Sequence, residues 1–322
     1  MDARFHQAKE FIEKAKKIVI TGHKDPDADS LGAMLALKIA LENLGKNSIA
    51  ASCSTLSPNL KFLPQTDKIS KNDDFDEVEL VIGVDYSDEK RLDLAKMDLR
   101  EIQVLTFDHH LIGKHLGFEI VESGYSSTCE LVYLFLKYLN TPISAEIATC
   151  LLAGIISDTG GFQHPNISAQ TFQIAAQLMA SGAILPKISR ELRKSNLPNE
   201  AKIWNITLEK MNFIPEIGLI YSFIDNASLS TISGDLNKGS LAVILSTAPE
   251  AKLSLLMAEV SPGIIEASLR SQKDRGINVA QIAQIFGGGG HILAAGFTAS
   301  EPPAQILRKI EIFLDKSGKN KV

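Results

Sequence analysis

The chain has 322 residues, a length that suits two domains better than one. Hydrophobic residues make up 45% and charged residues 22%, as in ordinary globular proteins, and the formal net charge of −5 argues against a dedicated binder of duplex DNA. No apolar run is long enough to span a bilayer, and the charged N-terminal stretch lacks the apolar core of a signal peptide. We therefore expect a soluble, cytoplasmic protein with no membrane partner.

The distribution of charge and the spacing of the cysteines limit the kinds of binding site that the chain can form. Residues 187–322 carry 16 Lys and Arg against 13 Asp and Glu, so the acidic excess lies in residues 1–186. An acidic half is either ordinary surface or a source of carboxylates that bind cations. The three cysteines are widely separated and odd in number, which argues against a disulfide framework or a zinc knuckle. We expect all three to be buried small apolar residues: Cys53, Cys129 and Cys150.

The first half of the chain alternates between helical and strand-like patterns. Helices are predicted at residues 2–16, 30–44, 127–139, 144–156 and 168–181. Strands are predicted at residues 17–23, 47–52, 78–85 and 103–110. This alternation predicts an α/β fold with a mostly parallel sheet that is covered on both faces.

The second half is predicted to form a smaller α/β domain. Residues 186–212 are polar and helix-prone, and we interpret them as a helical connector between a domain at 1–185 and a domain at 213–322. Strands are predicted at residues 217–224, 241–246, 253–260 and 264–270, and helices near residues 278–286 and 302–315.

Four stretches of the first half place ionisable residues just after an apolar strand or an apolar helical run. They contain His23, Asp27 and Asp29; Asp85; Asp108, His109 and His110; and Asp158. Taken singly, each stretch also fits a helix cap, a turn or a solvated pair. Because open α/β sheets bind ligands at the carboxyl ends of their strands, the four together favour a metal site that offsets the repulsion between the carboxylates.

The ligand types indicate which metals would fit. Oxygen and imidazole donors without cysteine suit Mn²⁺ or Mg²⁺ better than structural zinc. Six ligands drawn from these eight residues are too many for one open site, and they suit two ions about 3.5–4 Å apart that share a carboxylate.

A run of four glycines near the C-terminus, Gly287 to Gly290, precedes His291. A flexible linker is one interpretation of this run. However, the run lies between a helical pattern and an apolar segment, which is poor context for a linker. Successive backbone N–H groups there can cradle a phosphate, and His291 can add a donor.

The order of these motifs resembles that of the DHH phosphoesterase superfamily, named for the motif that stands here as Asp108-His109-His110. The resemblance covers roughly residues 5–315, and it includes the glycine-rich signature of the DHH-associated C-terminal domain. The closest match within the superfamily is the NrnA type, bifunctional oligoribonucleases and 3′-phosphoadenosine 5′-phosphate phosphatases. One departure concerns Gln163-His164, where related sequences carry an arginine, and this weakens the transfer of substrate preference.

The resemblance implies a role for each candidate residue. His23 and Asp27 would bind one metal ion, while Asp29, His109 and Asp158 would bind a second, with Asp85 shared by both. His110 would stabilise the charge on the substrate phosphate, and Asp108 would orient the histidine pair. The substrate-binding residues would be Arg270, Gly287, Gly288, Gly289, Gly290 and His291.

The resemblance therefore predicts a metal-dependent phosphoesterase that acts on short single-stranded oligoribonucleotides or nucleotides. Its cofactors would be two divalent ions, Mn²⁺ foremost, with Mg²⁺ or Co²⁺ as alternatives. Linear dinucleotides and 3′-phosphoadenosine 5′-phosphate are the expected substrates, and cyclic di-AMP is the main rival. A non-catalytic nucleotide sensor is the alternative of another class, disfavoured because no metal ligand is missing. The sequence leaves the oligomeric state open, a homodimer included.

Overall fold

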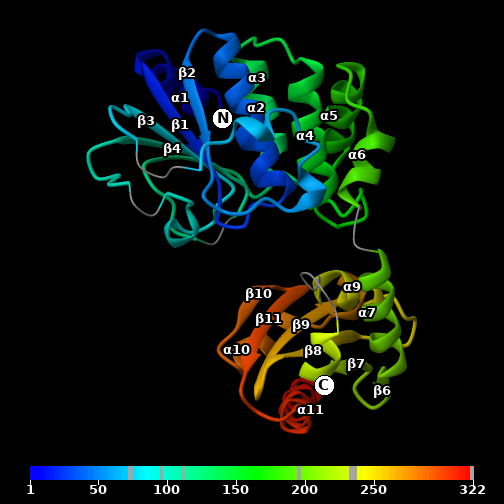
Figure 1. The fold of residues 1–322 in the computed structure, drawn as a ribbon. Helices are drawn as coiled ribbons and strands as arrows, with labels where there is room; N and C mark the ends of the chain where they lie inside the picture. The colour runs from blue at the N-terminus through cyan, green and yellow to red at the C-terminus, as the bar shows by residue number, and fades with distance from the viewer. Residues whose placement is uncertain (72–74, 95–96, 111–112, 194–196, 232–237, 320–322) are drawn as a thin grey trace. The chain divides into compact units, whose positions relative to one another are not determined.

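The computed structural model describes residues 1–71, 75–94, 97–110, 113–193, 197–231 and 238–319. Contacts between residues divide the chain into two compact units, Met1–Lys194 and Ser195–Val322. Each unit has its own sheet and its own hydrophobic core (Figure 1). The predicted connector 186–212 spans the division: one of its helices lies in the first unit and one in the second, and residues 194–196 lie outside the described ranges.

The first unit is built on a five-stranded sheet with the order β2-β1-β3-β4-β5. Its strands are β1 Lys17–Thr21, β2 Asn47–Ala51, β3 Leu80–Val84, β4 Gln103–Asp108 and β5 Phe118–Val121. Every neighbouring pair is parallel, which confirms the predicted α/β class. All five carboxyl ends therefore lie at one edge of the sheet.

Helices cover one face of this sheet (Figure 1). Helices α1 Asp2–Lys14, α2 Ala28–Asn43 and α3 Thr128–Tyr138 lie against the strands. Helix α4 Ala145–Asp158 packs on α2 and α3, and α5 Ala169–Ala180 and α6 Leu185–Leu192 pack on α4. Three short 3₁₀ turns accompany them: η1 Pro58–Leu60, η2 Thr66–Lys68 and η3 Glu89–Arg91. Helix α2 is buried over nearly its whole length, because its Ala- and Leu-rich sequence is apolar on every side.

The two faces of the sheet follow from the two-residue period of its strands. Ile18 and Ile20 belong to the core beneath the helices, whereas Val19 between them faces a separate cluster. That second cluster is completed by side chains from connecting segments, among them Phe75 and Leu99. Helices thus cover one face of the sheet and connecting segments cover the other. Loops and helix ends meet at the carboxyl edge.

The second unit is built on a six-stranded sheet with the order β10-β11-β9-β8-β7-β6. Its strands are β6 Asn212–Ile214, β7 Leu219–Ile224, β8 Leu253–Ser261, β9 Ile264–Ser271, β10 Gly289–His291 and β11 Ala294–Ala299. Its helices are α7 Leu197–Glu209, α8 Asn226–Ser230, α9 Lys238–Ser246, α10 Val279–Gln284 and α11 Pro303–Lys319, with the 3₁₀ turn η4 Lys273–Arg275. The β7–β8 pair is parallel and the other pairs are antiparallel. Among the helices that the structure describes, none is both long enough and apolar enough to cross a membrane.

Two expectations from the sequence are wrong. Residues 241–246, predicted as a strand, belong to helix α9. Leu241, Ala242 and Leu245 are buried with helical spacing while Ile244 is exposed, so packing of one helical face overrides the local β-branched pattern.

Cys53, expected to be buried, is exposed. It follows the end of β2, where the chain leaves the sheet for a loop.

Candidate active site at the carboxyl edge of the first sheet

The loop after β1 presents His23 in a defined tautomer. Nδ1 of His23 lies 2.7 Å from the carbonyl oxygen of Lys24. Since a carbonyl only accepts, Nδ1 carries a proton, and in the neutral ring Nε2 then holds the lone pair. Nε2 is 3.7 Å from Asp27 Oδ1 and 3.9 Å from Asp85 Oδ2. A Cβ at Gly22 would lie 2.0 Å from Ser30 Oγ, so a larger residue there would displace the hydroxyl that accepts from His23 N.

The first turn of α2 supplies two carboxylates. Asp27 caps the helix, and its Oδ1 accepts hydrogen bonds from Asp29 N and Ser30 N. Asp29 is fully buried, and its two oxygens accept from Thr128 N at 2.6 Å and Cys129 N at 2.9 Å, at the start of α3. Burial, followed by the charge of a neighbouring carboxylate, raises the pKa of Asp29 to about 7. This carboxylate therefore has its orientation fixed while its charge lacks compensation.

Asp85 follows β3 in an unusual backbone conformation. Its φ of +53° lies in the left-handed region, which L-residues other than Asn and Asp rarely adopt. The side chain is buried, and its Oδ1 accepts a hydrogen bond from Thr128 Oγ1 at 3.1 Å. Burial and then the charge of Asp29 raise the pKa of Asp85 well above its usual range.

The Asp108-His109-His110 motif closes β4. Asp108 is buried and binds both the backbone N–H of His110 at 2.9 Å and the ring Nδ1 of His110 at 2.8 Å. His109 turns the other way, and its Nε2 lies 3.1 Å from Asp158 Oδ2 and 3.6 Å from Asp85 Oδ1. Asp108 thus orients the second histidine while the first faces the carboxylates.

Asp158 reaches the site from the last residue of α4. A close approach of α4 to α2 makes this contact possible, because a Cβ at Gly154 would lie 2.6 Å from Asp29 Oδ1 and 2.3 Å from Cys129 Sγ. Burial, and next the charge of Asp27, raise the pKa of Asp158 to about 8.

The structure thus gathers these residues into three overlapping groups, each with ligand atoms within 4.8 Å of one another. The groups are His23, Asp27 and Asp85; Asp29, His109 and Asp158; and Asp85, His109 and His110. Buried Nε2 of His109 has no hydrogen-bond partner among the described residues, although carboxylates surround it. An orphaned imidazole nitrogen among carboxylates with raised pKa values fits a divalent cation, which would both accept the lone pair and offset the negative charge.

Sequence reasoning missed one part of this site, the N-terminus of α3. Thr128 donates to Asp29 through its backbone and to Asp85 through its hydroxyl. Ser127 caps this helix, and the Ser-Ser-Thr run before Glu130 was visible as a helix start. The sequence could not show that this start would lie against two carboxylates more than 40 residues away.

The second unit holds the other predicted site residues at an edge of its sheet. Arg270 on β9 pairs with Ala294 on β11, and Ala294 pairs with His291 on β10. Directly paired residues point to the same face, so Arg270 and His291 share a face two strands apart. His291 is exposed, and Arg270 is partly buried with its guanidinium donating to the carbonyl of Leu269.

The glycine run is part of this edge rather than a linker. Gly287 has φ +73°, and Gly289 and Gly290 lie in β10. A Cβ at Gly288 would lie 2.2 Å from Gly296 O, and one at Gly290 would lie 2.5 Å from Ala294 O. Glycine is therefore required at these two positions for β10 to approach β11, whereas Gly289 has open space around it.

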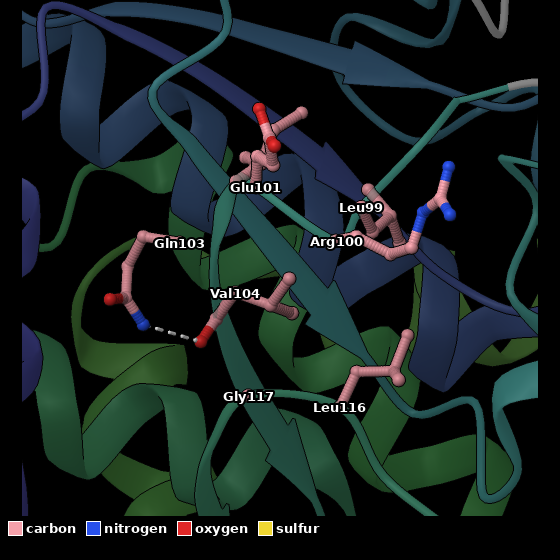
Figure 2. A pocket seen from close by; sticks show the side chains of 8 residues that line it. Leu99, Arg100, Glu101, Gln103, Val104, Leu116 and Gly117 are labelled. Carbon is pink, nitrogen blue, oxygen red and sulfur yellow. Dashed lines mark hydrogen bonds between the residues drawn. The ribbon is translucent and has the colours of Figure 1, made fainter.

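A separate pocket lies away from these residues. It has a volume of about 520 Å³ and is formed at the amino end of β4 and the segment before β5. Figure 2 shows that Gln103 and Val104 flank it together with Leu116 and Gly117. The amino and carboxyl ends of a parallel strand lie at opposite edges of a sheet, so this pocket is no part of the carboxylate and histidine cluster.

Comparison with known proteins agrees with this arrangement. Residues 17–155 match the family described as DHH family, N-terminal domain, and residues 217–316 match the DHHA1 domain. The chain therefore carries the N-terminal domain of the DHH family followed by a DHHA1 domain. The family's members are metal-dependent phosphoesterases, and the chain is an enzyme of this kind.

Three curated proteins illustrate the range of its relatives. Uncharacterized protein MG371 of Mycoplasma genitalium is 29% identical over 97% of this chain and 97% of its own length. Bifunctional oligoribonuclease and PAP phosphatase NrnA of Thermus thermophilus is 27% identical over 87% of this chain and 83% of its own length. Cyclic-di-AMP phosphodiesterase GdpP of Geobacillus thermodenitrificans is 26% identical over 92% of this chain but 46% of its own length.

Solved structures confirm the fold. An exopolyphosphatase-related protein from Bacteroides fragilis superposes with a TM-score of 0.88 at 22% identity, covering 98% of this chain and 96% of that one. RecJ from Thermus thermophilus, solved in complex with Mn²⁺, superposes with a TM-score of 0.55 at 14% identity, covering 98% of this chain and 54% of RecJ.

Proposed function

We propose that this DHH-family enzyme hydrolyses short 5′-phosphorylated oligoribonucleotides to mononucleotides and converts 3′-phosphoadenosine 5′-phosphate to AMP, using two divalent metal ions. The observation that carries the proposal is the meeting of six ligand-type side chains, from four stretches of the chain, in two groups of which Asp85 borders both. The likeness to the NrnA of Thermus thermophilus over most of both chains supports the substrate class.

We assign the metal ligands on the basis of the two groups. His23, Asp27 and Asp85 would hold one ion, and Asp29, His109 and Asp158 would hold the other, with Asp85 shared. Their oxygen and imidazole donors favour Mn²⁺, with Mg²⁺ and Co²⁺ as alternatives. When bound, the ions supply Lewis acidity, which lowers the pKa of water and offsets charge on the phosphoryl group.

The remaining side chains act on the substrate. Asp108 accepts from Nδ1 of His110 and so fixes the ring, which would stabilise the charge on a phosphoryl oxygen of the substrate. In the second unit, Arg270 and His291 offer donors on one face of the sheet, whereas the N–H groups of Gly287 and Gly288 already donate to carbonyls of the preceding helix. These donors suit a terminal phosphate or a base of a short substrate.

The test is Mn²⁺-dependent turnover of a 5′-phosphorylated dinucleotide, with 3′-phosphoadenosine 5′-phosphate, cyclic di-AMP and pyrophosphate in parallel. We expect release of mononucleotides from the dinucleotide and of phosphate from the bisphosphate. Metal-loaded protein that turns over none of the four would refute the proposal and favour a nucleotide sensor.

A second candidate function is hydrolysis of cyclic di-AMP. The match to GdpP over 92% of this chain favours it, since the shared region contains both domains. Preference for cyclic over linear dinucleotide in the parallel assay, measured as kcat/KM, would make this the main activity.

A further inference from the structure

Asp108 lies between two histidines. It is fully buried, and its Oδ1 is occupied by the backbone and the ring of His110. Its Oδ2 accepts from Ser87 N at 2.8 Å and lies 3.3 Å from Nε2 of His115. The two oxygens of one carboxylate thus face two different imidazoles.

His115 was singled out by no sequence motif, yet its side chain is only 4% exposed. Its buried Nε2 makes no hydrogen bond among the described residues, and the carboxylate that it faces is Oδ2 of Asp108, with which a protonated ring forms an ion pair. Two other carboxylates lie near the His115 ring. Oε2 of the half-exposed Glu119 is 3.7 Å from Nδ1, the opposite ring nitrogen, and the carboxylate of Asp88 acts at longer range. A buried polar atom is costly unless it is paired, so the position of this ring calls for an explanation.

The segment that carries His115 is held in place through both backbone groups of the next residue, Leu116. Leu116 N donates to Tyr86 Oη at 2.7 Å, and Leu116 O accepts from Thr106 Oγ1 at 2.8 Å. The Tyr86 ring contacts the His115 ring edge to face, with centroids 5.4 Å apart. These contacts hold the imidazole beneath β4 and leave Asp108 as the charged group that its Nε2 meets inside the protein.

We infer that His115 is a positioning residue for the reaction. By binding Oδ2 of Asp108 it fixes the rotation of that carboxylate, and the carboxylate in turn fixes the ring of His110 toward the metal-binding cluster. The inference rests on the proposed role of His110 at the substrate phosphate. His115 itself touches neither the substrate nor the residues assigned to the metals, so its effect passes through Asp108.

The experiment compares H115F, which keeps a ring of similar shape but removes the donor, with H115Q, which restores an N–H donor. We expect H115F to lower kcat about tenfold, at the lower end of the loss seen when outer partners of functional histidines are removed. KM and bound metal should stay within about twofold of the unchanged protein, and H115Q should recover most of kcat. H6F, at an exposed histidine of α1, is the matched control and should be neutral.

A double-mutant cycle with H110A separates positioning from a general structural role. If His115 acts through His110, H115F should cost nothing further in the H110A background, whereas independent losses multiply. Multiplying losses, an unchanged kcat in H115F, or equal loss of kcat in H115F and H115Q would overturn the inference.

One readout needs no turnover. The His110 Nδ1 proton held by Asp108 should exchange slowly in NMR spectra of the unchanged protein and of H115Q, and faster in H115F. Equal exchange in all three would overturn the inference even in an active enzyme. An inactive protein that showed the predicted difference would refute the proposed function while leaving the positioning contact intact.

Discussion

The two candidate sites of this chain are built in opposite ways. At the carboxyl edge of the first sheet, the side chains are largely buried and held by backbone donors, as Asp29 is by the start of α3. In the second unit, His291 is exposed on an edge strand, and the Arg270 guanidinium donates to the carbonyl of its own neighbour, Leu269. A buried cluster keeps its geometry without a ligand, whereas an exposed edge keeps donors available. We therefore expect changes in the first site to affect turnover and changes in the second to affect binding.

The largest expected effect is that of Asp85→Asn. The substitution keeps the size of the side chain but removes the charge shared by both proposed metal groups. We expect kcat to fall at least about 10³-fold, the upper end of the cost of losing one electrostatic contact. Steady-state kinetics with Mn²⁺ and metal analysis of the purified protein check this. Asp98→Asn, at an exposed aspartate paired with Arg100, is the control. Wild-type turnover by Asp85→Asn would remove the shared-ligand assignment.

The second prediction concerns pH in metal-free protein. Burial, followed by charge from neighbouring carboxylates, raises the pKa of Asp29 to about 7 and that of Asp158 to about 8. Both groups titrate near pH 3.9 in an unfolded chain, so the folded chain binds more protons between about pH 4 and pH 8. The free energy of unfolding should then fall as pH rises through this window, by about 1.4 kcal/mol per pH unit for each proton retained.

Denaturant titrations at pH 5, 6, 7 and 8 in EDTA measure this slope, and the same series with Mn²⁺ provides the comparison. Because a cation binds the ionised carboxylates, Mn²⁺ should stabilise the protein more at pH 8 than at pH 5. A metal-free protein whose stability rises from pH 5 to pH 8 would show that these carboxylates are already compensated within the chain.

A pair of glycines tests the difference in packing between the two sites. Gly154→Ala places a Cβ 2.3 Å from Cys129 Sγ and 2.6 Å from Asp29 Oδ1, so α4 must move away from α2. We expect a loss of about 1–3 kcal/mol in the free energy of unfolding, with weaker metal binding. Gly289→Ala meets nothing within 4 Å and should stay within about 0.5 kcal/mol. Equal costs at both positions would contradict the described packing.

Sequence patterns predicted the first unit well, for a physical reason. Strands such as Lys17–Thr21 and Leu80–Val84 are short apolar runs, and each is followed by polar residues at its carboxyl end. Parallel pairing must bring those ends to one edge, so the meeting of Asp85 with His23 and His109 follows from topology. The pattern could not show which backbone donors would meet the carboxylates, because Thr128 reaches Asp29 only through the packing of α3.

The second unit was predicted less completely. Residues 241–246 carry a β-branched pattern that tertiary packing overrides in α9, and the hairpin of β10 and β11 has glycine and alanine where strands usually have bulky residues. His115 lacks a local signal as well, because its contact with Asp108 depends on the segment held by Tyr86. Local pattern thus locates ligand-type residues that follow a strand, and it misses residues such as His115 that contact them through tertiary packing.

The smallest expected effect is that of Arg270→Ala, and it tests the binding side of the comparison. Removal of one charge-assisted hydrogen bond, worth roughly 1.5 kcal/mol, should raise KM about tenfold. kcat should change less than about twofold, because none of the residues that we assign to the metal ions lies in the second unit. Arg308→Ala, at an exposed arginine of α11, is the matched control and should leave KM unchanged. A fall in kcat at constant KM would mean that Arg270 acts on the transition state, and the division between a catalytic unit and a binding unit would no longer hold.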